Sequence, residues 1–147
     1  MQGWINVGSP DNFEVLRARG FDVAPFKASR QKQSADMRPG DRIVYYLTKD
    51  VLFGGVVEVT GAAYEDTSDI GLRSEGKPGE DYPYRIATKP IVIAKPGNAI
   101  DVRDITDLLD KTRSFGPKKL GMCFRGNLHR ISDADLKTIE GLLKQRA

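Results

Sequence analysis

The sequence predicts a single α+β domain over residues 1–147: a small curved sheet or open β-barrel of about five to six strands, with about three helices packed outside it. The length allows one hydrophobic core and is too short for two, and 39% of the 147 residues are hydrophobic against 29% charged. Short runs of β-branched and aromatic residues predict the strands. The helical patterns lie at separated places without regular strand–helix–strand alternation, which argues against a doubly wound parallel sheet.

The first strand and the first helix are expected at the start of the chain. Residues 4–7 are typical of a short strand. Ser9 is then a good N-cap, Pro10 occupies the first helical position, and Asp11 lies in the first turn. Gly20 ends this helix. The following stretch, residues 21–37, is polar and irregular, with room for a short helix.

A hairpin is expected in the middle of the chain. After a Pro-Gly-Asp turn, residues 42–48 are rich in branched and aromatic side chains, and residues 52–64 form the returning run. Gly54-Gly55 interrupts that second run. Paired glycines inside a strand usually mark a bulge or the close approach of another backbone or a ligand.

The rest of the chain predicts a loop, a strand and two helices. Residues 67–80 form the loop, and residues 84–93 form a strand that Pro90 places at an edge or a bulge. Asp101 is expected to cap a short helix. A last strand is expected within residues 120–128, and Ser132 begins the final helix, whose apolar positions are Leu136, Ile139, Leu142 and Leu143.

Composition excludes several classes of protein. No stretch approaches 18 consecutive apolar residues, so no membrane span is expected, and the first residues do not resemble a signal peptide. Cys123 is the one cysteine and His129 the one histidine, which excludes an internal disulfide and argues against a structural zinc site. We therefore expect a protein of the cytosol or nucleoid, with no metal and no cofactor.

The distribution of charge says more than the net charge of +3. Residues 111–131 carry six basic side chains and no carboxylate, and residues 27–49 carry six more against two aspartates. Such clusters indicate a local anionic partner, for which phosphate is the usual chemistry, or simply a solvated basic face. The candidate phosphate-binding residues are Lys27, Arg30, Lys32, Lys118, Lys119 and Arg130.

The groups that catalysis requires are mostly missing. His129 stands beside Arg130 with no nucleophile motif near it, so a surface or phosphate-facing histidine is the favoured interpretation. Cys123 lies between Met122 and Phe124, an apolar context typical of a buried, inert thiol. Gly54-Gly55 is not followed by the Lys-Ser/Thr of a nucleotide P-loop. A protein that is not an enzyme is the prediction.

The aromatic residues offer a binding function instead. Most of them are expected to build the core. Tyr45 and Tyr46, however, are neighbours in one strand and must face opposite sides of it, so one can serve the core while the other faces a cavity. Trp4, next to a capped helix, is another candidate wall. Aromatic walls stack on bases at roughly 1–3 kcal/mol each.

Seven segments, in this order and spacing, resemble the EVE domain, a member of the PUA-like superfamily that also includes the YTH readers. The likeness is to the short prokaryotic EVE-type proteins and covers nearly the whole chain. The segments are Trp4-Ile5, residues 12–16 (NFEVL), residues 37–46 (MRPGDRIVYY), residues 53–60 (FGGVVEVT), residues 81–85 (DYPYR), residues 88–91 (TKPI) and residues 122–126 (MCFRG).

The resemblance implies a PUA-like open barrel with a pocket for a base turned out of its strand. It implies a non-catalytic reader of a modified base in DNA or RNA, and a modified cytosine above all. It also implies an association with restriction or RNA-modification systems. By the same resemblance, Ser9 and Asn12 are candidate contacts to the base edge and Arg125 lies near the mouth or a phosphate. The full set of candidate pocket residues is Trp4, Ser9, Asn12, Phe26, Tyr45, Tyr46, Phe53, Gly54 and Arg125.

Two departures from related families bear on this expectation. The eukaryotic branch has Lys-Ser-Glu-Pro after its first strand and Phe-Tyr-His-Ser in its second, where this chain has residues 6–10 (NVGSP) and 46–49 (YLTK). The base that the eukaryotic branch recognises can therefore not be assumed for this chain. The Gly-x-Lys-x-x-Glu-x-Arg segment of the ASCH branch, which includes hydrolases, is absent. A PUA-like enzyme acting on RNA or a modified nucleoside, and a binder of a small ligand or protein, stay as alternatives.

Overall fold

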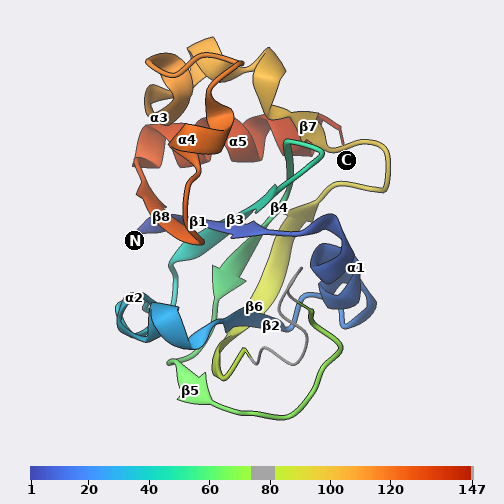
Figure 1. Ribbon diagram of the computed structural model, residues 1–147, viewed down its shortest axis with the longest axis vertical. Coiled ribbons are helices and arrows are strands. Elements are labelled where there is room, and N and C mark those ends of the chain that lie inside the picture. The colour runs from blue at the N-terminus through green and yellow to red at the C-terminus, as the bar shows by residue number, and fades with distance from the viewer. Residues whose placement is uncertain (74–81, 147) are drawn as a thin grey trace.

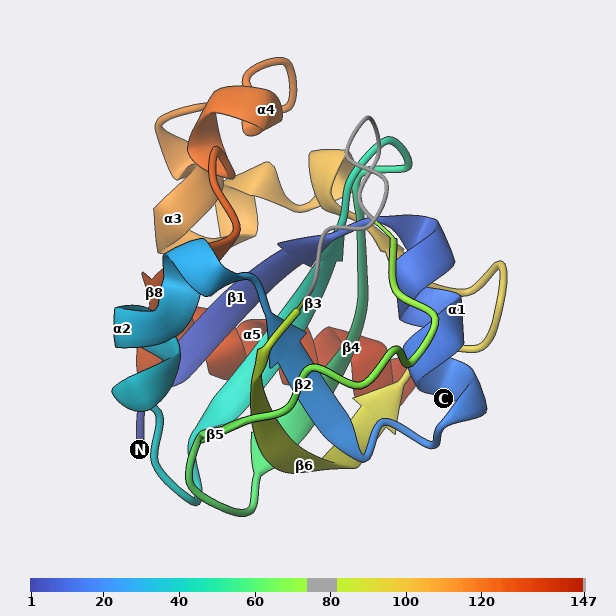
Figure 2. The ribbon, with the colours of Figure 1, turned by 60° about the horizontal axis from the view of Figure 1, so that its bottom comes forward.

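A computed structural model describes residues 1–73 and 82–146 and shows a strongly curled mixed sheet with helices outside it (Figures 1 and 2). In the described residues the sheet has eight strands: the path β2-β6-β4-β3-β1-β8, with β5 paired to β6 and β7 paired to β4. The strands are β1 Gly3–Gly8, β2 Val23–Phe26, β3 Arg42–Leu47, β4 Leu52–Val59, β5 Tyr64–Glu65, β6 Tyr84–Ile93, β7 Ile100–Asp101 and β8 Leu128–Ile131. Only the β1–β3 pairing is parallel among these.

The helices lie on the outside of this curled sheet. Helices α3, α4 and α5 lie on one side of β1, β3 and β4, whereas β2, β5 and α2 lie on the other side (Figure 1). The described α-helices are α1 Pro10–Ala18, α2 Gln31–Ala35, α3 Asp110–Arg113, α4 Leu120–Cys123 and α5 Asp133–Gln145. Short 3-10 turns lie at Ala28–Arg30, Val102–Asp104 and Thr106–Leu108. The predicted α+β open barrel is confirmed, with more short strands and helices than expected.

The capping signals produce the expected helices. The Ser9 side chain accepts a hydrogen bond from the backbone N–H of Asn12 at the start of α1, and Ser132 does the same for Asp135 in α5. Asp101 caps the 3-10 turn at Val102–Asp104 by accepting a hydrogen bond from the N–H of Arg103. Each cap satisfies a backbone donor that the first turn leaves unpaired.

Two local predictions were wrong. Residues 21–37 contain the expected short helix, α2, but also the strand β2, which pairs antiparallel with β6. It escaped notice because it is four residues long and includes Pro25, which is tolerated in an edge strand. Residues 120–128 begin with helix α4, and strand β8 starts only at Leu128. A short apolar run does not by itself distinguish a buried helical turn from a strand.

The paired glycines form the predicted bulge. Tyr45 pairs with Gly55 and Tyr46 with Phe53, so Gly54 has no partner across the β3–β4 ladder. A Cβ at Gly54 would lie 2.8 Å from the Cζ of Phe13, so α1 packs directly on this strand. Pro90 likewise lies at a bulge, between β6 and β4.

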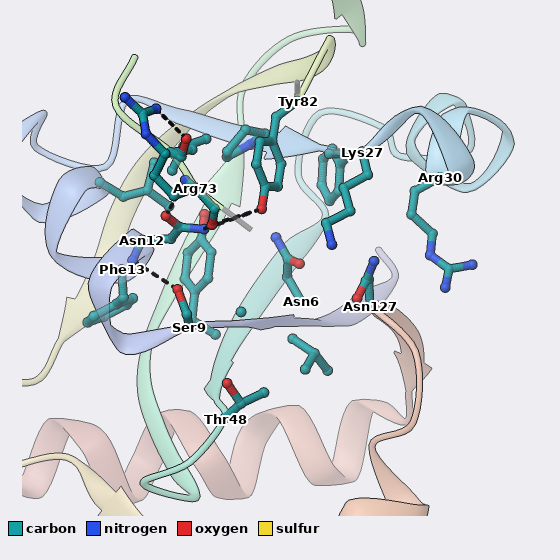
Figure 3. A pocket seen from close by; sticks show the side chains of 17 residues that line it. Asn6, Ser9, Asn12, Phe13, Lys27, Arg30, Thr48, Arg73, Tyr82 and Asn127 are labelled. Carbon is teal, nitrogen blue, oxygen red and sulfur yellow. Dashed lines mark hydrogen bonds between the residues drawn. The ribbon is translucent and has the colours of Figure 1, made fainter. Parts of the chain in front are cut away.

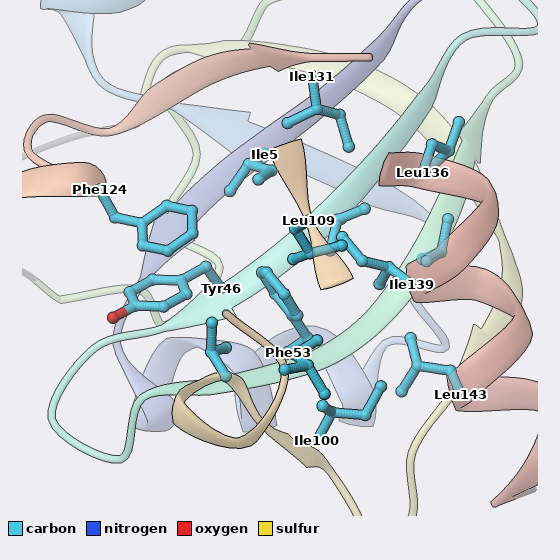
Figure 4. Close-up of a cluster of buried hydrophobic side chains, with 14 of the residues drawn as sticks. Ile5, Tyr46, Phe53, Ile100, Leu109, Phe124, Ile131, Leu136, Ile139 and Leu143 are labelled. Carbon is cyan, nitrogen blue, oxygen red and sulfur yellow. The ribbon is translucent and has the colours of Figure 1, made fainter. Parts of the chain in front are cut away.

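The sheet separates two hydrophobic clusters, and the tyrosine pair spans it. Tyr46 packs with Phe53 and Phe124 in the cluster that also contains the apolar side of α5 (Figure 4). Its ring is stacked on that of Phe124, with centroids 4.1 Å apart. Tyr45 belongs to the opposite cluster, together with Trp4 and the apolar side of α1. The alternation predicted for these two residues is confirmed, and it places Tyr45 on the side of the sheet that carries a cavity.

Candidate base-binding pocket

A cavity of about 290 Å³ lies between the end of β1, the start of α1, β2 and the end of β3 (Figure 3). Its volume is at the lower end of the range for small-molecule sites, which suits one planar base. Its apolar and aromatic lining consists of Val7, Phe13, Leu16, Pro25, Phe26, Tyr45, Leu72 and Tyr82. Its polar and small lining residues are Asn6, Gly8, Ser9, Asn12, Lys27, Arg30, Thr48, Arg73 and Asn127.

Strand β1 brings three of its alternate residues to one face of the sheet. Trp4, Asn6 and Gly8 share that face because side chains alternate along a strand. Trp4 is covered by the core, whereas Asn6 and Gly8 line the cavity further along the strand. Asn6 rises from β1 opposite Tyr82 (Figure 3).

The start of α1 is tied to the far wall through one amide. The side-chain nitrogen of Asn12 donates to the carbonyl oxygen of Arg73 at 2.7 Å and to the Tyr82 hydroxyl at 3.3 Å. The side-chain oxygen of Asn12 accepts from the Arg73 N–H at 2.9 Å. Asn12 therefore holds Arg73 and Tyr82 against the helix N-terminus, which fixes the width of the cavity.

The aromatic walls are packed against one another. The ring of Phe13 meets the ring of Tyr45 edge-on, with the two ring centres 5.6 Å apart. The ring centres of Phe13 and Phe21 are 5.1 Å apart. Burial raises the pKa of Tyr45 far above its usual value, so its hydroxyl stays protonated. Tyr82 is half-buried, with the Nζ of Lys27 5.9 Å from its ring centre. These rings give the cavity flat, apolar surfaces.

Three cationic residues line the cavity, Lys27, Arg30 and Arg73, and among the described residues no carboxylate lines it. The Nε of Arg30 is buried and has no hydrogen-bond partner in residues 1–73 and 82–146. The Nη2 atom of Arg30 lies 3.3 Å from the position that a Cβ added to Gly126 would occupy. The Arg30 side chain therefore packs on the loop before Asn127. The mouth is therefore positive and suits an anionic backbone.

The structure brings Ser9, Asn12, Phe26 and Tyr45 together around the cavity, with Lys27 and Arg30 beside them. The other five expected pocket residues lie outside the lining: Trp4, Tyr46, Phe53, Gly54 and Arg125. Tyr46 and Phe53 belong to the cluster on the opposite face of the sheet. Gly54 is covered by Phe13, and Arg125 is exposed in the loop after α4.

Trp4 is a core residue in this structure. It is 1% exposed, and its Nε1 donates to Oδ2 of Asp41 at 3.3 Å. The guanidinium of Arg130 lies 4.4 Å from its ring centre, and Arg130 is also paired to Asp36 at 3.3 Å. Trp4 and Arg130 thus contact each other rather than the cavity. Lys32, Lys118 and Lys119 are exposed and lie outside the lining.

Sequence reasoning missed several lining residues, among them Asn6, Gly8, Thr48 and Asn127. The alternation from Trp4 could have indicated Asn6 and Gly8, since all three share one face of β1. Asn127 and Thr48 come from loops next to strand ends, and their approach depends on the pairing of β1 with β8 and β3. No local pattern signals that proximity.

Burial and neighbouring groups shift the pKa values of the one histidine and the one cysteine, His129 and Cys123. The pKa of His129 is lowered by burial and by the nearby Lys111, whose Nζ lies 3.5 Å from Nδ1. Burial also raises the pKa of Cys123, whose Sγ donates to the carbonyl oxygen of Lys111. Neither residue lines the cavity. In the described ranges no three His, Cys, Asp or Glu residues are grouped for a metal ion, and no helix is long and apolar enough to span a membrane.

Comparison with known proteins decides the family. The family model of the EVE domain matches residues 2–142. This chain belongs to the EVE domain family. The UPF0310 protein PH1033 of Pyrococcus horikoshii is 29% identical to it over 153 residues, which cover 97% of this chain and 99% of that protein. The expected membership is confirmed.

Solved structures similar to this EVE domain confirm the PUA-like fold. The YTH domain of the Zygosaccharomyces rouxii MRB1 protein, solved with N6-methyladenosine RNA, has a TM-score of 0.67 at 15% identity and covers 97% of this chain and 86% of its own. Human THYN1, solved with DNA that contains 5-methylcytosine, has a TM-score of 0.62 at 12% identity over 98% of both chains.

Proposed function

We propose that this EVE domain binds nucleic acid by receiving one modified base in the cavity between β1, α1, β2 and β3, and that the base is a modified cytosine. The observation that carries the proposal is the cavity itself: it has the size of one base, aromatic walls and a positive mouth. The family and the two similar structures solved with methylated nucleic acid support it.

The recognition follows from the physical character of the lining. Phe26 and Tyr82 offer ring surfaces on which a base can stack. Asn6 and Ser9 offer polar atoms to its edge, while Lys27 and Arg30 attract the phosphates next to it. A base must leave its stack to enter, and flipping it out of a duplex costs a few kcal/mol. Single-stranded or mismatched sites are therefore the better ligands.

We propose that binding leaves the base chemically unchanged. In the part of the chain that the structure describes, the cavity lining contains no histidine, cysteine or carboxylate. General acid–base catalysis most often uses a histidine or a carboxylate within hydrogen-bond reach of the substrate. The lining instead combines aromatic surfaces with amides and hydroxyls, which suits binding.

A panel of oligonucleotides tests the proposal. Single strands of one sequence, in DNA and RNA form, carry one cytosine, 5-methylcytosine, adenine or N6-methyladenine at the centre, and their affinities are measured by fluorescence anisotropy. The expected result is tighter binding of the 5-methylcytosine strand than of the cytosine strand, with the oligonucleotide recovered unaltered by mass spectrometry. Equal affinity across the panel, or chemical conversion of the base, would contradict the proposal.

The exposed lysines test a separate contribution from the backbone. Lys118→Ala with Lys119→Ala is expected to weaken modified and unmodified strands equally, since binding to phosphate does not depend on sequence. The slope of log affinity against log salt should fall by roughly 0.7 for each phosphate of a single strand that the variant no longer neutralises. Salt titrations of the wild type and the variant measure this slope. A variant that loses its preference for the modified base but keeps its slope would reverse this division of roles.

A further inference from the structure

Two lining residues of the cavity, Arg30 and Tyr45, each have a buried polar atom with no partner among the described residues, and Tyr45 is the one enclosed by the aromatic wall. Tyr45 lines the cavity and is 3% exposed. Its hydroxyl is buried and has no hydrogen-bond partner in residues 1–73 and 82–146. Buried hydroxyl groups are normally hydrogen-bonded, because losing water without a replacement is unfavourable. A group left in this state beside a cavity of base size indicates that the missing partner belongs to a ligand.

The surroundings of Tyr45 prevent the ring from turning out to water. Its backbone is held on both sides, opposite Asn6 of β1 and Gly55 of β4. Its ring is packed against Phe13 at 5.6 Å and Phe21 at 6.1 Å. The hydroxyl is therefore fixed in place before any ligand arrives, which avoids the entropic cost of ordering it on binding.

The polar groups at the start of α1 already bond one another. The side chain of Asn12 bonds Arg73 and Tyr82, and the Oγ of Ser9 accepts from the Asn12 N–H. Burial keeps Tyr45 protonated by raising its pKa, so it retains a proton to donate. Tyr45 is thus a neutral donor that no described residue uses.

We propose that Tyr45 is a specificity-determining residue whose hydroxyl donates a hydrogen bond to a ring nitrogen or carbonyl oxygen on the innermost edge of the bound base. This inference rests on the proposed function and gives Tyr45 a role different from stacking. A base that presents a C–H or methyl group at that place leaves the hydroxyl unpaired and binds weakly. A site built to hydrogen-bond its ligand rejects analogues that lack the group much more strongly than an apolar pocket does.

The variant Tyr45→Phe separates this role from a structural one. Its affinity for the tightest-binding strand of the panel is expected to fall about tenfold or more, because the acceptor on the base loses its partner. Its Tm is expected to stay unchanged or to rise, because the ligand-free protein no longer buries an unpaired hydroxyl. Anisotropy and thermal denaturation without ligand give the two readouts.

Tyr46→Phe is the matched control. It removes the hydroxyl oxygen from the next residue, whose ring is stacked on Phe124 on the opposite face of the sheet. The affinity of the Tyr46→Phe protein is therefore expected to equal that of the wild type. Wild-type affinity of Tyr45→Phe would overturn the inference while leaving the reader function intact. A fall in Tm with equal losses for every strand would also overturn it, because the hydroxyl would then be structural. A wild type that prefers no strand of the panel would overturn both proposals.

Discussion

Replacing Trp4 with alanine is expected to destabilise the protein by about 3–5 kcal/mol, the usual cost of truncating a buried aromatic side chain. Trp4 is 1% exposed and packs in the cluster that supports the cavity. The change also removes the hydrogen bond to Asp41 and the packing against Arg130. The corresponding fall in Tm is on the order of 10 °C, measured by thermal or urea denaturation.

The ligand preference of this variant distinguishes a core residue from a cage wall. At a temperature where Trp4→Ala is folded, it should still bind the modified strand more tightly than the unmodified one. Trp4→Phe keeps most of the buried ring and should show a smaller loss of stability. If Trp4→Ala kept the wild-type Tm but no longer distinguished the two strands, Trp4 would contact the base after all.

Filling the cavity from Gly8 is expected to have the largest effect on binding. Gly8 lines the cavity, shares the face of β1 with Asn6, and a Cβ built on it meets no atom within 4 Å. A leucine there occupies the space of the base without displacing the backbone. Stacking contributes roughly 1–3 kcal/mol per base, so Gly8→Leu should lower the affinity for the modified strand by about 10-fold to 100-fold.

Gly141→Leu is the control for this change. Gly141 lies in α5, outside the cavity, and a Cβ there also meets nothing within 4 Å. Its affinity should match that of the wild type, and the Tm of both variants should stay close to it. A Gly8→Leu protein that is folded and binds the modified strand with full affinity would show that the base does not enter this cavity.

Much of the fold could be predicted because its signals are local. Ser9 and Ser132 each cap a helix through a hydrogen bond three residues away, and Gly54-Gly55 marks a bulge within one hairpin. Strand β2 could not be predicted in the same way. Its four residues become a strand through pairing with β6, some sixty positions later in the sequence, and carry little pattern of their own.

Site residues could be predicted where the alternation of a strand or the capping of a helix determines the position of a side chain. They could not be predicted where segments far apart in the sequence meet. Two adjacent tyrosines had to face opposite sides, but the sequence could not say which side holds the cavity. Trp4 was a plausible wall because it stands near the helix start, yet it lies two residues before the cavity on its strand, under Arg130. The contribution of Tyr82 depends on its bond to Asn12, seventy positions away.

A crystal structure of this EVE domain with a single-stranded oligonucleotide that carries its preferred modified base tests the central claim most directly. The predicted result is one base turned out of the strand and lying in the cavity, against the ring of Tyr82 and within hydrogen-bond distance of the Tyr45 hydroxyl, with its phosphates near Lys27 and Arg30. A strand bound on another face of the sheet, with the cavity between β1 and α1 free of any base, would contradict the account.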